Sequence, residues 1–384
     1  MINWERVRSD FPITKKCVYF QSAGMSPMPL HVFNEIVSGY REILEYGDLY
    51  WLDDLKNYHS LKKNLAELIN SSDQDIAMMP NTSYVMSFIA DAVKKKRPGK
   101  VISMACEFPA TTLPFEYKGL EMVYIKPEDN RYDVDRIAKL INKDTSAVLT
   151  SYVQYCTGFR QNLKALGQVC KEKKVLFIVN ATQGLPFFPV DVKSMNIDAL
   201  SASFHKWGLS GHVGSLFYTS EFFRNEFPQT MAGWLSIEHP EDDFVNTEKN
   251  VPFKLLKSAD RYILGTTNLQ SLNGLRCAIN YLKDIGFKNI QQRILKLSDY
   301  LHKGLKKMEI EILSPVNCVE ERSAITVVSV GENTRKLFEY LEKNKIYCAM
   351  RNKNLRISLN FFNNYNDIDY LIDSTEKFLN SIKN

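Results

Sequence analysis

The sequence predicts an α/β fold in which a mostly parallel sheet is covered by helices on both faces. The first observation is that short β-rich runs alternate with longer helical runs through the middle of the chain. The second is that these β-rich runs are continuously apolar, which is typical of strands buried on both faces. The third is a change of pattern near residue 270, which predicts a second, smaller α+β domain.

The central part of the chain contains six runs that predict strands. They are KVISMA (100–105), EMVYIK (121–126), SAVLTSYV (146–153), VLFIVN (175–180), ALSASF (199–204) and GSLFYTS (214–220). Between them, VDRIAKLIN (134–142) and NLKALGQVCKEKK (162–174) predict helices, because their apolar residues recur at three-to-four spacing.

A long helical segment from about Asn268 to Met308 precedes the C-terminal unit. That unit contains the strands ITVVSV and RISL, a helix around TRKLFEYLEKNK and a last helix. We therefore expect a large ligand-binding domain over 19–270 and a small C-terminal domain over 271–384. Residues 1–18 should form an N-terminal segment that packs on the small domain.

Composition excludes several classes of function. The chain has 384 residues, of which 45% are hydrophobic and 24% charged, and these are values of a globular protein. Its 49 basic and 44 acidic residues are spread along the sequence, so we expect no nucleic-acid partner. The basic run VKKKRPGK (93–100) is interpreted as a helix end followed by a loop.

The cysteines and the apolar runs bear on the cellular compartment. The seven cysteines are scattered and form no CxxC pair, which favours a reducing compartment and argues against both a disulfide framework and a zinc site. No metal site is expected. The chain starts without a signal-like apolar segment and has no apolar run of 18 residues. We therefore expect a cytoplasmic protein with no membrane partner.

Polar residues follow the predicted strands, where ligands of open α/β sheets gather. They are Thr82 and Ser83, Glu107 and Phe108, Thr157 and Gly158, Asn180 and Gln183, and Ser203, His205 and Lys206. Hydroxyls at a helix start suit a phosphate, and an aromatic ring, amides and an amine suit an aromatic aldehyde held as a Schiff base. This combination predicts pyridoxal phosphate (PLP) as the cofactor.

The chain resembles the class V aminotransferase family, the fold-type-I PLP enzymes that include cysteine desulfurases, kynureninase and isopenicillin N epimerase-like enzymes. The resemblance lies in the order and spacing of motifs over nearly the whole chain. They are YFQSAGMSPMP (19–29), NTSYVMSFIA, CEFPA, SYVQYCTG, VNATQGLPFFPVDV, SASFHKWG, GTTN (265–268) and LRISLNFFNNYNDIDYLI (355–372).

The resemblance implies a role for each of ten residues. Lys206 would form the Schiff base, and its amine must then be neutral. Thr82, Ser203 and His205 would contact the cofactor phosphate, with Ser83 as a further donor. Phe108 would stack on the pyridine ring, Asn180 would face its nitrogen and Gln183 its oxygen. Thr266 would reach the phosphate in the second subunit of a homodimer, and Arg356 would bind the substrate carboxylate through its two-pronged geometry.

Each of these residues also has an ordinary structural interpretation. A histidine–lysine pair alone is more often a surface lysine beside a satisfied histidine. Thr82 and Ser83 are equally suited to capping a helix, Phe108 to packing in the core and Arg356 to a structural ion pair. For three aromatic residues, Tyr50, Trp51 and Tyr155, packing in the core or at an interface is favoured over a place in the substrate pocket.

Two departures from the family pattern bear on the reaction. Most members have an aspartate where this chain has Asn180, and a neutral amide cannot hold a proton on the pyridine nitrogen. That substitution suits elimination or epimerisation better than transamination. Desulfurases carry a cysteine between two C-terminal arginines, whereas AMRNKNLRIS (349–358) has none and Cys348 occupies a buried strand position.

These observations predict a PLP enzyme that acts at the α-carbon of an amino acid. By family frequency, an aminotransferase is expected first, and a PLP-dependent lyase or epimerase is the alternative raised by Asn180. A PLP-binding scaffold without turnover is a third possibility, and a cysteine desulfurase is disfavoured by the missing cysteine.

Overall fold

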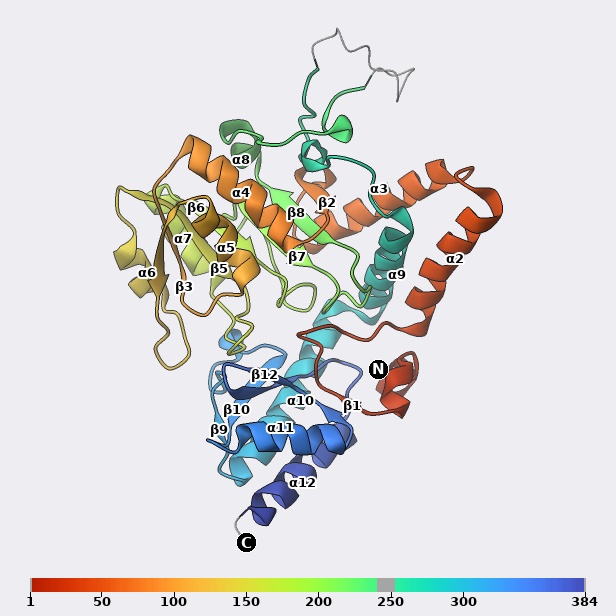
Figure 1. Ribbon diagram of the computed structural model, residues 1–384, viewed down its shortest axis with the longest axis vertical. Helices are drawn as coiled ribbons and strands as arrows, with labels where there is room; N and C mark the ends of the chain where they lie inside the picture. Colours follow the sequence, from red (N-terminus) through yellow and green to blue (C-terminus); the bar gives the residue numbers. More distant parts are fainter. Residues whose placement is uncertain (1, 240–252, 383–384) are drawn as a thin grey trace.

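The computed structural model describes residues 2–239 and 253–382, and they form a large α/β unit above a smaller α+β unit (Figure 1). The strands of the large unit are β2 (Ile76–Met79), β3 (Lys100–Met104), β4 (Glu121–Ile125), β5 (Thr145–Ser151), β6 (Leu176–Asn180), β7 (Ala199–Ser203) and β8 (Ser215–Thr219). Its helices are α2 (Leu30–Tyr46), α3 (Trp51–Leu68), α4 (Thr82–Lys96), α5 (Pro109–Tyr117), α6 (Val134–Leu140), α7 (Leu163–Lys173), α8 (Glu221–Glu226) and α9 (Leu269–Ile285).

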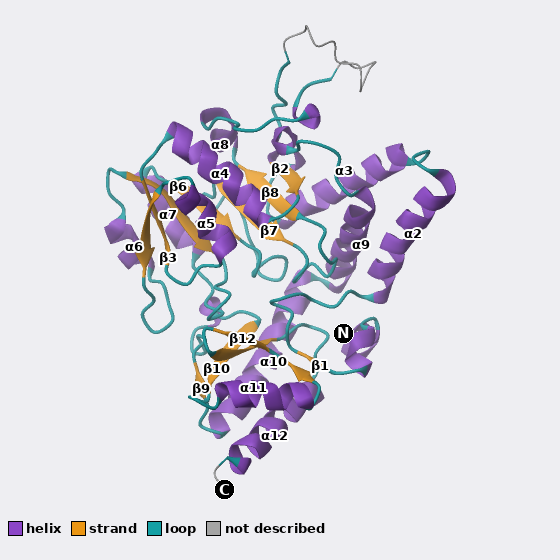
Figure 2. Ribbon diagram, viewed as in Figure 1, coloured by secondary structure: helices purple, strands orange, loops and turns teal. Residues whose placement is uncertain are grey.

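The large sheet runs in the order β2-β8-β7-β6-β5-β3-β4 in the described part of the chain. The central strands pair in parallel, and only β8 runs antiparallel to both of its neighbours. All residues of β5, β6 and β7 are buried, because helices cover both faces of the sheet. Figure 2 shows the strands between the helical layers. The predicted fold class is therefore confirmed.

The two faces of the sheet have separate apolar cores. Side chains from α4, α5 and α8 pack on one face, whereas those from α3, α6, α7 and α9 pack on the other. The sheet is thus held between two apolar layers of helices. The carboxyl ends of the parallel strands β3, β5, β6 and β7 therefore lie along one edge of the sheet.

The small unit contains α10 (Phe287–Lys307), α11 (Thr334–Lys343) and α12 (Tyr365–Ser381), packed on a sheet of order β12-β13-β10-β9. The strands are β9 (Glu311–Ile312), β10 (Ile325–Ser329), β12 (Ala349–Arg351) and β13 (Asn354–Ser358). The long helix expected over 268–308 is two helices, because Gly286 between α9 and α10 has φ +91°. Residues of L type rarely adopt that φ, so the glycine ends one helix and starts the next.

The N-terminal segment lies against the small unit. It contains α1 (Trp4–Ser9), and β1 (Val18–Tyr19) pairs in parallel with β11 (Ile346–Tyr347). Arg8 forms an ion pair of 2.7 Å with Asp367 at the start of α12, and Phe11 packs on the rings of Phe361 and Phe362. These contacts hold the N-terminal segment against the small unit, and the domain division at residue 270 stays a prediction.

Among the residues that the structure describes, none of the helices combines the length and apolar character needed to span a bilayer.

Candidate active site

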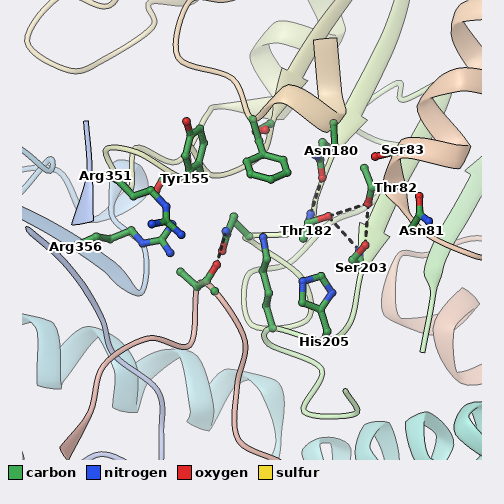
Figure 3. A pocket seen from close by; sticks show the side chains of 17 residues that line it. Asn81, Thr82, Ser83, Tyr155, Asn180, Thr182, Ser203, His205, Arg351 and Arg356 are labelled. Atoms are coloured by element: carbon green, nitrogen blue, oxygen red, sulfur yellow. Dashed lines mark hydrogen bonds between the residues drawn. The ribbon is translucent and has the colours of Figure 1, made fainter. Parts of the chain in front are cut away.

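A cavity of about 260 Å³ lies at the carboxyl edge of the large sheet, where β12 and β13 of the small unit approach it. Nine of the ten side chains predicted from the sequence line this cavity. They are Thr82, Ser83, Phe108, Asn180, Gln183, Ser203, His205, Lys206 and Arg356. Figure 3 shows Arg351 and Arg356 on one side of the cavity and Asn81, Thr82 and Ser83 on the opposite side.

Lys206 follows β7 and lines this cavity. Burial, together with the positive charges of Arg356 and Arg351, lowers the pKa of its amine to about 7. The Nζ atom lies 5.5 Å from the centre of the Phe108 ring. A large fraction of this amine is therefore neutral near pH 7, which is the state needed to attack a carbonyl carbon.

A cluster of buried hydroxyls forms the wall near the start of α4. The Oγ1 atom of Thr82 lies 2.9 Å from Ser203 Oγ and 3.2 Å from Ser215 Oγ, and Ser201 Oγ is 2.9 Å from Ser215 Oγ. Thr182 Oγ1 accepts a hydrogen bond of 3.1 Å from the backbone of Ser203. Together with the first turn of a 15-residue helix, these donors form a site suited to an anion such as phosphate.

Asn180 and Gln183 are held in place by hydrogen bonds beside Lys206. The Nδ2 group of Asn180 donates to Thr111 Oγ1 at 2.8 Å, and its Oδ1 accepts from the backbone of Thr182 at 3.1 Å. Gln183 donates to the carbonyl of Ala23 at 3.0 Å and accepts from the Trp207 indole at 3.0 Å. Each amide keeps one N–H for a ligand, because an NH₂ group carries two donors.

Arg356 points into the cavity from β13 and has unused donors. Its Nη1 group donates to the carbonyl of Tyr155 at 3.1 Å, but Nε and Nη2 have no hydrogen-bond partner although the residue is only 1% exposed. Within residues 2–239 and 253–382, neither Arg356 nor Arg351 has a carboxylate within 4.0 Å. Desolvation by burial, together with the charge of Arg351, lowers the pKa of Arg356 to about 10. Two unpaired guanidinium groups make this end of the cavity a receptor for a carboxylate.

His205 and Thr266 differ in position. Burial, together with the charge of Lys206, lowers the pKa of His205 to about 4, so this imidazole is neutral near pH 7. The centre of its ring lies 4.9 Å from the centre of the His212 ring. Thr266 is absent from the cavity and lies in a separate hollow with Tyr84 and His212. Its predicted role in a partner subunit stays a prediction.

Eight of the residues that line the cavity were not among those predicted from the sequence, and three of the eight bear on the chemistry of the site. Tyr155, for which packing was favoured, lines the cavity, and its ring meets that of Phe108 edge to face with the centres 5.3 Å apart. Thr182 and Arg351 also line it. Thr182 could have been predicted as a site residue, because it lies two residues beyond the end of β6. Tyr50 and Trp51 lie at the start of α3, away from the cavity.

The residues present fit PLP. A buried amine, an anion site, an exposed Phe108 face and amide donors surround one cavity, while two arginines stand at its other end. This fold and this set of groups define a PLP-dependent enzyme of fold type I.

Comparison with known proteins agrees with that class. The family model for class V aminotransferases matches residues 18–371, so the chain belongs to that family, and the predicted family and PLP cofactor are confirmed. A probable cysteine desulfurase of Pyrococcus abyssi is 26% identical, over 99% of this chain and 98% of the relative. A cysteine desulfurase structure from Thermococcus onnurineus superimposes with a TM-score of 0.89, at 22% identity and 99% coverage of both chains. A C-DES mutant with glycine covalently linked to PLP superimposes with a TM-score of 0.87, at 18% identity, over 96% and 98% of the two chains.

These relatives contradict the functional prediction made from the sequence. Similar proteins are named cysteine desulfurases, so the expectation of an aminotransferase and the judgement that a desulfurase is disfavoured were wrong. The lyase, epimerase and scaffold alternatives fit no better. The error has a physical reason: a missing cysteine concerns only the group that receives sulfur. The lysine, the hydroxyl cluster and the arginines that the resemblance assigned to binding the cofactor and the amino acid all line the cavity.

Proposed function

We propose that this protein is a PLP-dependent desulfurase that removes sulfur from cysteine or a closely related amino acid. The observation that carries the proposal is the cavity in which the buried Lys206 amine faces the unpaired donors of Arg356. The relatives supply the choice of sulfur chemistry, because cysteine desulfurases match nearly the whole chain.

The chain's own residues have distinct tasks in this proposal. Thr82, Ser83, Ser203 and His205 would hold the cofactor phosphate, and Phe108, Asn180 and Gln183 would hold its ring. PLP, when bound, provides an electron sink for the electrons released at the substrate α-carbon. Lys206 would be the covalent attachment point and, with a pKa of about 7, would accept the α-proton and return it. Arg356 would fix the α-carboxylate.

We further propose that the sulfur acceptor is a thiol outside residues 349–358. That segment consists of β12, a short turn and β13, and it contains no cysteine. Cys348, just before it, is 1% exposed, and burial raises the pKa of its thiol. The balanced reaction would therefore convert cysteine and an added thiol, RSH, to alanine and the persulfide RSSH.

A product assay tests the proposal. The PLP-loaded protein is incubated with L-cysteine at increasing concentrations of dithiothreitol, and alanine and sulfide are quantified. We expect equal amounts of both, at a rate that rises with thiol concentration, and no products from the Lys206→Ala variant. Formation of a keto acid with conversion of the cofactor to its amine form, without sulfide, would contradict the proposal.

A cytoplasmic homodimer is also part of the proposal. All seven cysteines are free thiols, which suits a reducing compartment. In the proposed dimer, Thr266 would contribute to the cavity of the second subunit, and several exposed apolar side chains of α2 would be buried at the interface. The exposed residues are Leu30, Phe33, Tyr40, Ile43 and Leu44.

A further inference from the structure

Two cysteines, Cys106 and Cys156, lie close together in the loops that carry Phe108 and Tyr155, the two aromatic residues that line the cavity. Cys106 follows β3 and Cys156 follows β5, and these strands are neighbours in the sheet, so both loops leave the same edge. The Cys156 thiol donates a hydrogen bond of 3.4 Å to the carbonyl oxygen of Cys106, and the two thiols are close enough for each to shift the pKa of the other. Cys106 is partly exposed and Cys156 is buried.

The two loops are fixed relative to each other by a buried carboxylate. Glu107 Oε1 accepts hydrogen bonds from the Ser151 backbone at 2.6 Å and from Gln154 Nε2 at 2.7 Å. Because Glu107 is the neighbour of Cys106, this clamp keeps the thiols together without a covalent bond. A disulfide would therefore join two loops that are already held next to each other, and forming it would draw the backbone of the Cys156 loop toward Cys106.

The surroundings favour the thiolate of Cys106 over that of Cys156. A hydrogen bond donated by the Cys156 thiol lowers the pKa of Cys106, whereas the same bond and burial raise the pKa of Cys156. The hydroxyl of Tyr132, which is 1% exposed, faces Cys106 and has no oxygen or nitrogen partner. An accessible thiolate beside a second thiol is the arrangement of a redox-active pair.

We propose that Cys106 and Cys156 form a thiol-exchange site that reacts with low-molecular-weight disulfides and closes to an intramolecular disulfide. The Cys106 thiolate attacks a disulfide RSSR, forming Cys106–S–SR and releasing RS⁻. The Cys156 thiol then displaces the second RS group as RSH, and the Cys106–Cys156 bond forms. Two protein thiols are oxidised and one external disulfide is reduced, so atoms and electrons balance.

Closure would act on amino-acid binding through the neighbours of the pair. Tyr155 precedes Cys156, and its carbonyl accepts the hydrogen bond of 3.1 Å from Arg356. Phe108 lies two residues after Cys106, and its ring packs on that of Tyr155. Tying the loops together displaces the Tyr155 carbonyl and therefore the guanidinium. The hydroxyl cluster at the other end of the cavity has no such link.

The chemical test uses the full-length PLP-loaded protein and oxidised glutathione. After the reagent is removed, non-reducing peptide mapping should find Cys106 linked to Cys156. Cys156→Ser should stop at a glutathione adduct on Cys106, and Cys106→Ser should carry neither product. Cys318→Ser removes another partly exposed thiol and serves as the matched control, which should cross-link like the unmodified protein. Adducts on Cys17 or Cys318, with Cys106 and Cys156 left as free thiols, would overturn the assignment.

The functional test compares two affinities before and after oxidation. Titration with L-alanine, an amino acid without a thiol that could reduce the cross-link, is followed by the absorbance of the bound cofactor and should show affinity weakened about fivefold or more, the usual lower range for coupled sites. PLP affinity should change less than alanine affinity, because Lys206 and the hydroxyl cluster lie outside the two loops. Dithiothreitol should reverse the effect, and Cys106→Ser should show none. An unchanged alanine affinity in the fully cross-linked protein would disprove the coupling. The test uses no sulfur-containing substrate, so its result is independent of the proposed desulfurase reaction.

Discussion

At the scale of single residues, the burial of Lys206 removes its amine from water and at the same time keeps a large part of that amine neutral. Its burial beside two arginines disfavours the ammonium form and lowers the pKa to about 7. An exposed lysine would keep a pKa near 10.4 and would be almost wholly protonated at neutral pH. The same desolvation that makes the position costly therefore prepares the amine as a nucleophile.

The first prediction concerns the pH dependence of cofactor binding. Because the folded pKa of Lys206 is lowered, the amine is neutral above about pH 7 and charged below it. The rate of PLP reconstitution into the cofactor-free protein should therefore fall about tenfold per pH unit below 7 and level off above it. Stopped-flow absorbance measures this rate, and borohydride reduction followed by peptide mapping should place the cofactor on Lys206. A rate that continues to rise to pH 10 would show that the pKa of Lys206 is that of an exposed lysine, which contradicts the prediction.

The second prediction concerns Asn180, whose partners also suit a carboxylate. The Thr182 N–H already donates to this side chain, and the Thr111 hydroxyl, now an acceptor, can rotate to donate. Asn180→Asp should fold normally and raise the pKa of the cofactor's pyridine nitrogen by about 1 or more, through a charge-assisted hydrogen bond. Nitrogen-15 NMR of labelled PLP measures the change. A pyridine nitrogen already protonated in the unmodified protein would refute the idea.

At the scale of elements, the loop between β5 and α7 joins the two domains at the active site. Gly158 in this loop has φ +74°, and a Cβ atom there would lie 2.3 Å from the carbonyl oxygen of Ile325 in β10. Ser314 and Ser323 of the small unit donate hydrogen bonds of 2.5 and 2.7 Å to the carbonyls of Thr157 and Gly158. The loop therefore sets how β10 and β13 meet the cavity.

The third prediction uses this close approach. Gly158→Ala should reduce the free energy of unfolding by about 3 kcal/mol or more, because the methyl group clashes with backbone that cannot move aside. Gly331→Ala is the matched control: Gly331 has φ +64°, but nothing lies within 4 Å of its added Cβ, so a loss of about 1 kcal/mol is expected. Urea unfolding measures both losses. Equal losses would mean that backbone strain alone matters at position 158.

The sequence predicted elements where one local signal dominates. The six apolar strand runs and the helices over 134–142 and 162–174 were recognised because burial on both faces and helical spacing are visible in the chain itself. Strand β2 (Ile76–Met79) was missed, since four residues at a sheet edge carry too little pattern. The break at Gly286 was also missed, because its φ depends on how α9 and α10 pack.

The candidate site could be predicted where it follows strand ends. Lys206, Asn180 and Phe108 lie at or just beyond strand ends, whose position is fixed by sheet topology. Tyr155 was judged a packing residue, because the sequence of the loop between β5 and α7 does not show which way its ring points. Arg351 was not assigned to the cavity, because its placement depends on how the small domain docks onto the large one. The sulfur chemistry was misjudged because a single absent cysteine was given more weight than the groups expected to bind the cofactor and the amino acid.

At the scale of the whole molecule, the position of Thr266 predicts how two chains cooperate. It lies in a hollow of about 420 Å³ with Tyr84 and His212, apart from the cavity of its own chain. Helix α2 lies beside this region, because Asn268 donates a hydrogen bond to the Tyr40 hydroxyl of α2, and the helix lies at the edge of the large unit (Figure 1). It exposes apolar side chains such as Leu44, which is 84% exposed. A two-fold dimer that buries α2 would give each cavity a Thr266 from the other chain.

The last prediction separates a shared site from a self-contained one. Thr266→Asp should repel the cofactor phosphate and inactivate its homodimer, and Lys206→Ala should inactivate its own. When the two variants are unfolded, mixed and refolded, each mixed dimer should contain one intact site, made of Lys206 from one chain and Thr266 from the other. About a quarter of the unmodified activity should return, because half of the dimers are mixed and each has one working site. The matched control mixes Lys206→Ala with Ser83→Asp, whose side chain lines the cavity of its own chain, so no activity should return. Sulfide release with dithiothreitol measures activity in both mixtures. If neither mixture regains activity, Thr266 serves its own chain and the shared site is disproved.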